Sequence, residues 1–213
     1  MQSVFNARMP RPTAVPKVAK IYAHGLPRYT TALCDADAPD RAELEQFIRD
    51  VFQHSYGASI RHFMPQLMSL RDSSGKLLAV CGLRHAGDAT LFLETYLDAP
   101  IETLIAQRVA QDVARADIVE VGNLAVAKPG IAPRLFASLN RHLHSTGGEW
   151  VVFTAVPMLR NSFMRLNMPL EVLAEAGLDR IAPHERAEWG RYYDGKPQVM
   201  TFRRASYPYY AAD

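Results

Sequence analysis

The run Ile118–Val126 constrains the fold more than any other stretch of this sequence. It is rich in β-branched residues, yet it contains one carboxylate, Glu120, and one amide, Asn123. A Lys-Pro-Gly turn at 128–130 follows it, and apolar residues then recur at helical spacing until a pair of glycines. This order predicts a buried strand that leads through a tight turn into an amphipathic helix. The first-turn amides of that helix, near Gly130, would be free to bind an anion.

A second strand is predicted after this helix, at Trp150–Val156, and a further helix begins near Pro157. Strand, helix and strand form a βαβ unit, which predicts a ligand site at the carboxyl ends of two parallel strands. Further strands are predicted at 29–34, 67–70, 77–83, 91–97, 172–176 and 199–203. A helix is predicted from Asp40 to about Gly57, with Asp40 and Glu43 as a capping box. Another helix should begin between Asp98 and Pro100.

The chain has 213 residues, which suits one domain with a single substantial core. Residues 1–28 are rich in proline, and we expect them to form an extended arm with a short strand at 18–23. The folded domain is expected at 29–205 and a tail at 206–213. We find no internal repeat or low-complexity segment.

Charge and composition exclude several classes of protein. The formal net charge is only +2, and no long run of one sign is present, so a nucleic-acid surface is not expected. Cys34 and Cys81 are the only cysteines, which argues against a disulfide framework and favours a reducing cytoplasm. The N-terminus lacks the apolar core of a signal peptide, and no apolar run reaches roughly 18 residues. We therefore expect a soluble, cytoplasmic protein.

Glu120 and Asn123 are the candidate catalytic residues. Strict strand alternation would place them on opposite faces, but a bulge at Gly122 would bring both to one cleft. A carboxylate in a partly apolar cleft has a raised pKa and suits a general base for an amine. The alternative is a structural carboxylate that pairs with an arginine. Gly130 has a similar alternative, because it could be only the turn residue between strand and helix.

Other polar residues give weaker indications. Glu94 and Tyr96, on the predicted strand at 91–97, could hold a cationic substrate or could simply alternate with buried residues. His142 and His144 lie two apart on a helix and face different directions, and the other histidines are dispersed, so no metal site is expected. Cys81 is expected in the core.

Several separated motifs, in this order, resemble the thermostable hemolysin family. They are Leu91–Asp98, Val119–Ala125, Trp150–Ala155 and Leu159–Asn161, and the likeness runs from about residue 41 to 202. That family is similar to a divergent branch of the GNAT acyltransferases, closest in style to the acyl-homoserine-lactone (AHL) synthases. The resemblance implies a single α/β domain with a GNAT-like mixed sheet flanked by helices.

The resemblance also implies roles for individual residues. Glu120 and Asn123 would lie on the splayed central strand, and the loop 130–132 would bind the pyrophosphate of an acyl carrier. Two departures stand out: Ala127 takes the place of the usual Arg or Gln before the loop glycine, and Phe163 that of a tyrosine acid. The implied donor contacts are Leu124, Val126, Gly130, Ile131, Ala132, Arg134 and Asn161, and the implied acceptor contacts are Glu94, Tyr96 and Thr154.

The expected activity is acyl transfer from a carrier thioester to the amine of a small metabolite, without an acyl-enzyme. The donor is acyl-CoA or, because of Ala127, an acyl-carrier-protein thioester, and no metal takes part. The alternative is a membrane-active or lipid-binding protein, as the family's name suggests, with tyrosines at 207, 209 and 210 as an interfacial patch. A third possibility is an acyl-carrier sensor without turnover.

Overall fold

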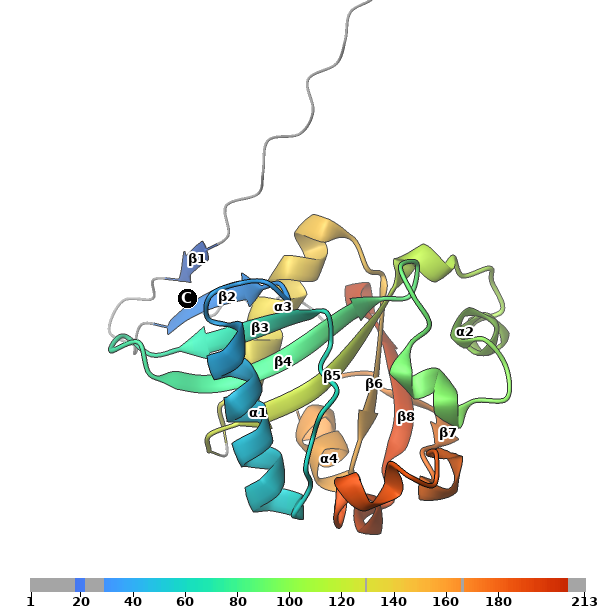
Figure 1. Ribbon diagram of the computed structural model, residues 1–213. Helices are drawn as coiled ribbons and strands as arrows, with labels where there is room; N and C mark the ends of the chain where they lie inside the picture. Colours follow the sequence, from blue (N-terminus) through green and yellow to red (C-terminus); the bar gives the residue numbers. More distant parts are fainter. Residues whose placement is uncertain (1–17, 22–28, 129, 166, 207–213) are drawn as a thin grey trace, which may run out of the picture.

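The computed structural model describes residues 18–21, 29–128, 130–165 and 167–206. Within these residues the chain forms one mixed sheet of eight strands in the order β1-β2-β3-β4-β5-β6-β8-β7 (Figure 1). The only parallel neighbours among them are β5 and β6. The strands are β1 Val18–Ile21, β2 Tyr29–Cys34, β3 Gln66–Arg71, β4 Leu77–His85, β5 Ile118–Val126, β6 Trp150–Ala155, β7 Glu171–Glu175 and β8 Gln198–Arg203.

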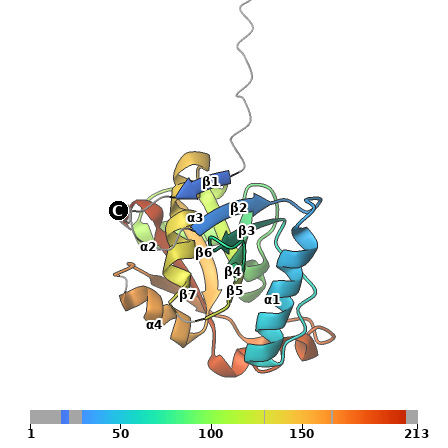
Figure 2. The same cartoon turned by 90° about the vertical axis from the view of Figure 1, so that its left-hand side faces the viewer.

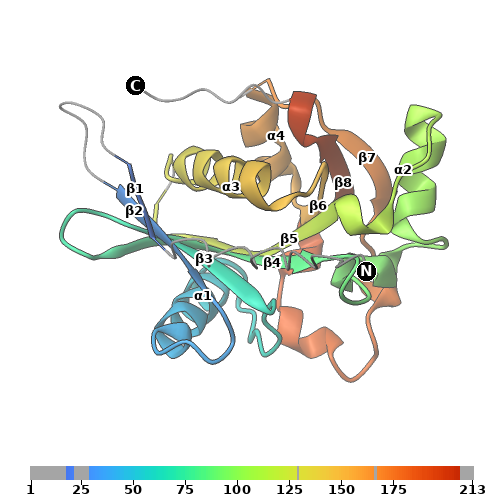
Figure 3. The same cartoon turned by 90° about the horizontal axis from the view of Figure 1, so that it is seen from above.

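Helices cover both faces of the sheet. Helix α1 (Arg41–Tyr56) packs on one face, and α3 (Ala132–Thr146) and α4 (Pro157–Arg165) pack on the other (Figures 2 and 3). Helix α2 (Ile101–Val109) lies near the start of β5, where its apolar residues pack with Ile118. The GNAT-like expectation of a mixed sheet flanked by helices is therefore confirmed.

Three apolar clusters hold these layers together. The largest joins the sheet to α3 and α4, and it includes Val119, Val121 and Phe163. A second surrounds α2, and a third lies between the sheet and α1. Residues Val119 and Val121 thus face α3, so Glu120 between them faces α1.

Strands β5 and β6 diverge, and this divergence positions the site. Their parallel ladder runs from Ile118–Trp150 to Val121–Phe153 and goes no further in the described residues, although β5 continues to Val126. The predicted βαβ unit of β5, α3 and β6 is therefore confirmed, with a gap at the carboxyl ends of its two strands.

A bulge in β5 lies beside this gap. Gly122 pairs with Gly82 and Ala125 with Val80, so two residues of β5 oppose one residue of β4. Asn123 occupies the bulge with φ +48°, and beyond it Leu124 packs on the α3 side. The expected effect of a bulge is thus observed, because Glu120 and the Asn123 side chain face the same side of the sheet.

Most elements predicted from the sequence are present, but two predictions are wrong. The segment predicted as a strand at 91–97 is a 3-10 helix, η1 (Phe92–Tyr96), because carboxylates rather than a neighbouring strand accept its backbone N–H groups. The expected capping box of α1 is also missing: Asp40 makes no side-chain cap, and Glu43 bonds Arg71 instead.

Candidate active site

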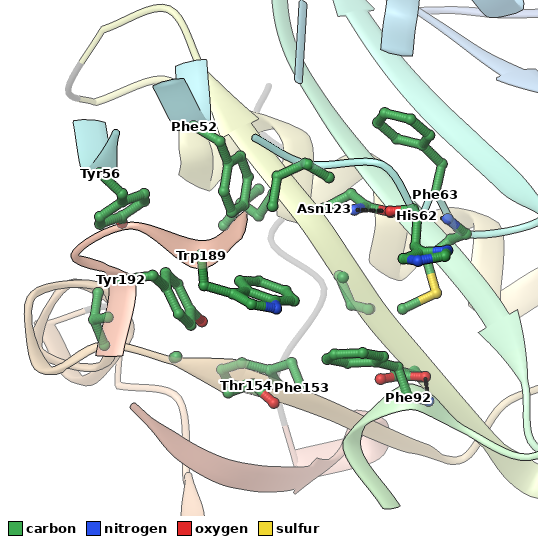
Figure 4. Close-up of a pocket in the computed structure, with 18 of the residues that line it drawn as sticks. Phe52, Tyr56, His62, Phe63, Phe92, Asn123, Phe153, Thr154, Trp189 and Tyr192 are labelled. Atoms are coloured by element: carbon green, nitrogen blue, oxygen red, sulfur yellow. Dashed lines mark hydrogen bonds between the residues drawn. The ribbon is translucent and has the colours of Figure 1, made fainter. Parts of the chain in front are cut away.

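A cavity passes through the gap between β5 and β6. Its walls come from both faces of the sheet, with Phe52 and Tyr56 of α1 on one side and Phe136 of α3 and Leu159 of α4 on the other. Figure 4 shows its aromatic lining on the α1 side. The cavity is also lined by charged, polar and aromatic residues, among them Arg61, His62, Met64, Arg84, Phe92, Tyr96, Glu120, Asn123, Leu124, Phe153, Thr154, Glu185, Glu188, Trp189 and Tyr192.

Glu120 is the buried carboxylate of this cavity, with 3% of the residue exposed. Its Oε2 accepts the Phe92 N–H at 2.8 Å, and its Oε1 accepts the Leu93 N–H at 2.9 Å. Burial raises the pKa of Glu120 to about 7, against the opposing effect of these two amides. Each oxygen keeps a second lone pair, so the carboxylate can still accept a proton near neutral pH.

The Asn123 side chain, expected to be catalytic, bonds two backbone groups of the segment before β3. Its Oδ1 accepts the Met64 N–H at 2.8 Å, and its Nδ2 donates to the His62 carbonyl at 3.2 Å (Figure 4). The side chain therefore ties the segment before β3 to the bulge of β5. Gly122 allows this close approach, because a Cβ there would lie 2.5 Å from the Met64 methyl.

Aromatic side chains enclose the α1 side of the cavity. Phe92, Trp189 and Tyr192 form a chain of ring contacts, with centroids 5.5 to 5.6 Å apart at each step. Tyr192 also meets the Tyr56 ring edge-on at 5.2 Å (Figure 4). Trp189 and Tyr192 were not predicted as site residues, although the density of aromatic residues at 189–193 was a signal.

The segment that carries Trp189 and Tyr192 is hydrogen-bonded to the end of α1 and the residues that follow it. The Ser59 N–H donates to the Glu188 carbonyl at 2.6 Å, and the Arg191 N–H donates to the Tyr56 carbonyl at 2.8 Å. Gly190, at φ +50°, lies so close that a Cβ would sit 2.3 Å from the Tyr56 oxygen. Contacts between residues more than a hundred positions apart thus complete the cavity.

Arg84 is a third cavity residue that was not predicted from the sequence. It lies on β4 directly opposite Glu120, and it lines the cavity. One guanidinium nitrogen donates to the Thr90 carbonyl at 3.2 Å. The structural alternative for Glu120 was a carboxylate that pairs with an arginine. Among the described residues, however, no ion pair joins Glu120 and Arg84.

The three expected acceptor residues are separated. Thr154 and Tyr96 line the cavity, and the Tyr96 hydroxyl lies 2.6 Å from that of Tyr193. Glu94 lies outside it: its carboxylate bonds Arg115 at 2.7 Å and accepts the Leu91 and Ile101 N–H groups. The hydrogen bonds from Arg115 lower the pKa of Glu94 to about 2. This geometry fits a structural role for Glu94.

The residues expected to contact the donor do not all lie in the cavity. Leu124 lines the cavity, whereas Gly130 is exposed with φ +85° at the start of α3, and Ile131 is buried beneath it. The first turn of α3 carries neither a side-chain cap nor an acidic residue. Val126 packs on the α3 side of the sheet, and Ala132 is the first residue of α3. The Arg134 guanidinium lies over the Tyr29 ring, 4.6 Å from its centroid. Asn161 is exposed on α4.

Among the described residues, no cysteine or serine lines the cavity. Cys81 is fully buried, and burial raises its pKa to about 12; burial likewise raises the pKa of Cys34 to about 11. Phe163 is packed between Phe136 and Phe153 in the core. In the described part of the chain we find no helix long and apolar enough to cross a membrane, and the C-terminal tyrosines proposed as an interfacial patch lie outside it.

Comparison with solved structures identifies the fold. FeeM, described as an N-acyl amino acid synthase from uncultured soil microbes, matches with a TM-score of 0.61 and 13% identity over 85% of this chain and 94% of that chain. A yellow fever mosquito protein assigned as an arylalkylamine N-acetyltransferase gives 0.59 and 12%, over 92% and 100%. The AHL synthase LasI gives 0.55 and 11%, over 83% and 90%.

These likenesses show that the fold is GNAT-like. No curated protein matches the chain in a sequence search. Residues 34–207 match the family described as thermostable hemolysin, and this range spans most of the sequence. The chain therefore belongs to the thermostable hemolysin family.

Proposed function

We propose that this protein transfers an acyl group from a carrier thioester to the amine of a small metabolite. The observation that carries the proposal is Glu120, a buried carboxylate with a pKa of about 7, in a cavity where two parallel strands diverge. The likeness to acyltransferase structures supports it, as does the apolar lining of the cavity.

The chemistry is a direct transfer. The amine nitrogen attacks the thioester carbonyl carbon, the carbon–sulfur bond breaks, and an amide and a thiol result. Glu120 accepts the proton that the amine loses, directly or through a water molecule. Backbone amides of β5 around Gly122–Leu124 polarise the carbonyl oxygen in this proposal. Phe163 offers no proton to the leaving thiolate, which takes it from water or from the donor's surroundings.

The donor approaches from the α3 side. Its phosphate lies on the uncapped first turn of α3 beside Gly130, and Arg134 adds a positive charge there. The acyl chain occupies the apolar part of the cavity formed by Phe136, Phe153 and Leu159. This lining favours a chain longer than acetyl, because only a longer chain buries its methylene groups there. The donor is an acyl-CoA or an acyl-carrier-protein thioester.

Thiol release tests the proposal. The full chain is incubated with acetyl-, octanoyl- and dodecanoyl-CoA, and with octanoyl acyl-carrier protein, each together with a panel of amines and amino acids. We expect amine-dependent thiol release and an amide product by mass spectrometry, with the longer acyl chains preferred. Hydrolysis without amide formation, or no consumption of any donor, would contradict it. Dye release from liposomes without thioester consumption would favour the membrane-active alternative.

A further inference from the structure

The acceptor side of the cavity holds Arg84, which forms no ion pair with any described residue, although its charge acts on the opposite Glu120 carboxylate. We propose that Arg84 binds a carboxylate of the acceptor, so that the acceptor is an α-amino acid with an apolar or aromatic side chain. This inference rests on the proposed acyl transfer and names its substrate class.

Strand register places Arg84 next to the base. Arg84 and Glu120 are direct partners in the antiparallel pair of β4 and β5, and both side chains line the cavity. Side chains of directly opposite residues project from the same face of a sheet, with Cβ atoms about 4.5 to 5.5 Å apart. An amine at Glu120 and a carboxylate at Arg84 must therefore belong to closely spaced atoms of one molecule. The α-amino and α-carboxylate groups of an amino acid meet this requirement.

The other basic side chains that line the α1-side opening already have acidic neighbours. The Arg61 Nε lies 3.1 Å from Glu188, and the His62 Nε2 lies 3.7 Å from Glu185. Arg84 forms no ion pair with any described residue, and one of its guanidinium nitrogens donates to the Thr90 carbonyl. A guanidinium has five N–H donors, so Arg84 retains donors for a carboxylate.

The charge pattern disfavours a simple amine. An alkylammonium ion at Glu120 would lie beside the Arg84 cation, so one carboxylate would face two positive charges, and the like charges would repel each other. An amino acid brings its own negative charge to Arg84. The cation also favours loss of the proton from the acceptor's ammonium group, which the attack requires.

The walls determine the side chain of the acceptor. Phe92, whose N–H donates to Glu120, contacts the Trp189 ring, and Tyr192 continues the aromatic surface (Figure 4). Apolar side chains gain free energy by leaving water for such a surface, and aromatic ones add ring contacts. The acceptor is therefore an amino acid such as leucine, phenylalanine or tyrosine rather than glycine or an acidic amino acid.

The test uses two product-like probes that differ only in the carboxylate. N-octanoyl-L-phenylalanine and N-octanoylphenethylamine are titrated by calorimetry into the wild type, Arg84→Gln and Arg84→Lys. We expect the wild type to bind the carboxylate probe about 10- to 100-fold more tightly. Arg84→Gln should abolish this preference, and Arg84→Lys should keep part of it. Arg203→Gln, which removes an arginine of β8 that does not line the cavity, is the control and should behave as the wild type.

Turnover separates this inference from the proposed function. Equal affinity of the wild type for both probes, or an unchanged preference in a folded Arg84→Gln protein, would overturn the inference, as would equal kcat/KM for phenylalanine and phenethylamine. If the carboxylate preference is present and depends on Arg84, but no thioester is consumed with any acceptor, then the carboxylate site stands and the acyltransferase proposal fails.

Discussion

Replacing Glu94 by glutamine should destabilise the fold and leave acceptor binding unchanged. Its bonds to Arg115 hold the pKa of Glu94 at about 2, against 4.5 for an ordinary glutamate. A shift of this size corresponds to up to about 3 kcal/mol of stability at pH 7. Because the Arg115 side chain is 29% exposed, solvent screening lowers the expected loss to about 1–2 kcal/mol.

The stability difference between the wild type and Glu94→Gln should depend on pH in a defined direction. The pKa of Glu94 is lower in the folded state, so its contribution is present above about pH 4.5 and is lost as the pH falls toward 2. Urea unfolding of the wild type and Glu94→Gln, followed by circular dichroism, should show a difference at pH 7 that shrinks to less than half at pH 3. Glu102→Gln is the matched control: Glu102 accepts one bond from the same arginine, whereas Glu94 accepts two from it and two more from backbone N–H groups, so Glu102→Gln should cost less.

Equal stability of the Glu94→Gln protein and the wild type at pH 7 would refute this reasoning. A raised acceptor KM without any loss of stability would do so as well, and it would restore the acceptor-binding role that the sequence suggested for Glu94.

Substitutions at three further positions test other parts of the account. Gly130→Glu should weaken donor affinity measured by calorimetry, because its charge would repel phosphate, whereas Gly130→Ala should cost about 1 kcal/mol of backbone strain and leave that affinity near the wild-type value. Asn123→Ala should lower the free energy of unfolding by about 1–3 kcal/mol, since two backbone groups lose their partner. Gly190→Ala should lower Tm and speed proteolysis after residue 178, because its Cβ would collide with the Tyr56 carbonyl; unchanged cleavage would contradict that packing.

The sequence was most informative where local patterns determine the structure. The β-branched run 118–126, the Pro-Gly turn and the periodic helix predicted β5, α3 and β6 because each depends on neighbouring residues. The bulge near Gly122 was also predictable, since glycine and asparagine tolerate its backbone conformation.

Residues placed by distant contacts were not predictable. The segment 91–97 alternates like a strand, but Glu120, far along the chain, accepts two of its N–H groups and favours a 3-10 turn. Arg84 faces Glu120 only because of strand register, and Trp189 reaches the cavity only because its segment is fixed to the end of α1. A single sequence does not encode such pairings in any short motif.

The pH profile of acyl transfer by the wild type and Glu120→Gln tests the central claim most directly. Since burial raises the pKa of Glu120 to about 7, the wild-type rate with saturating donor and acceptor should rise through about pH 7. Glu120→Gln should be about 100- to 10,000-fold slower and should lose this limb, while its donor affinity persists. Glu102→Gln, outside the cavity, should keep the wild-type profile. A folded Glu120→Gln protein that transfers acyl groups at the wild-type rate across this range would show that Glu120 only anchors η1.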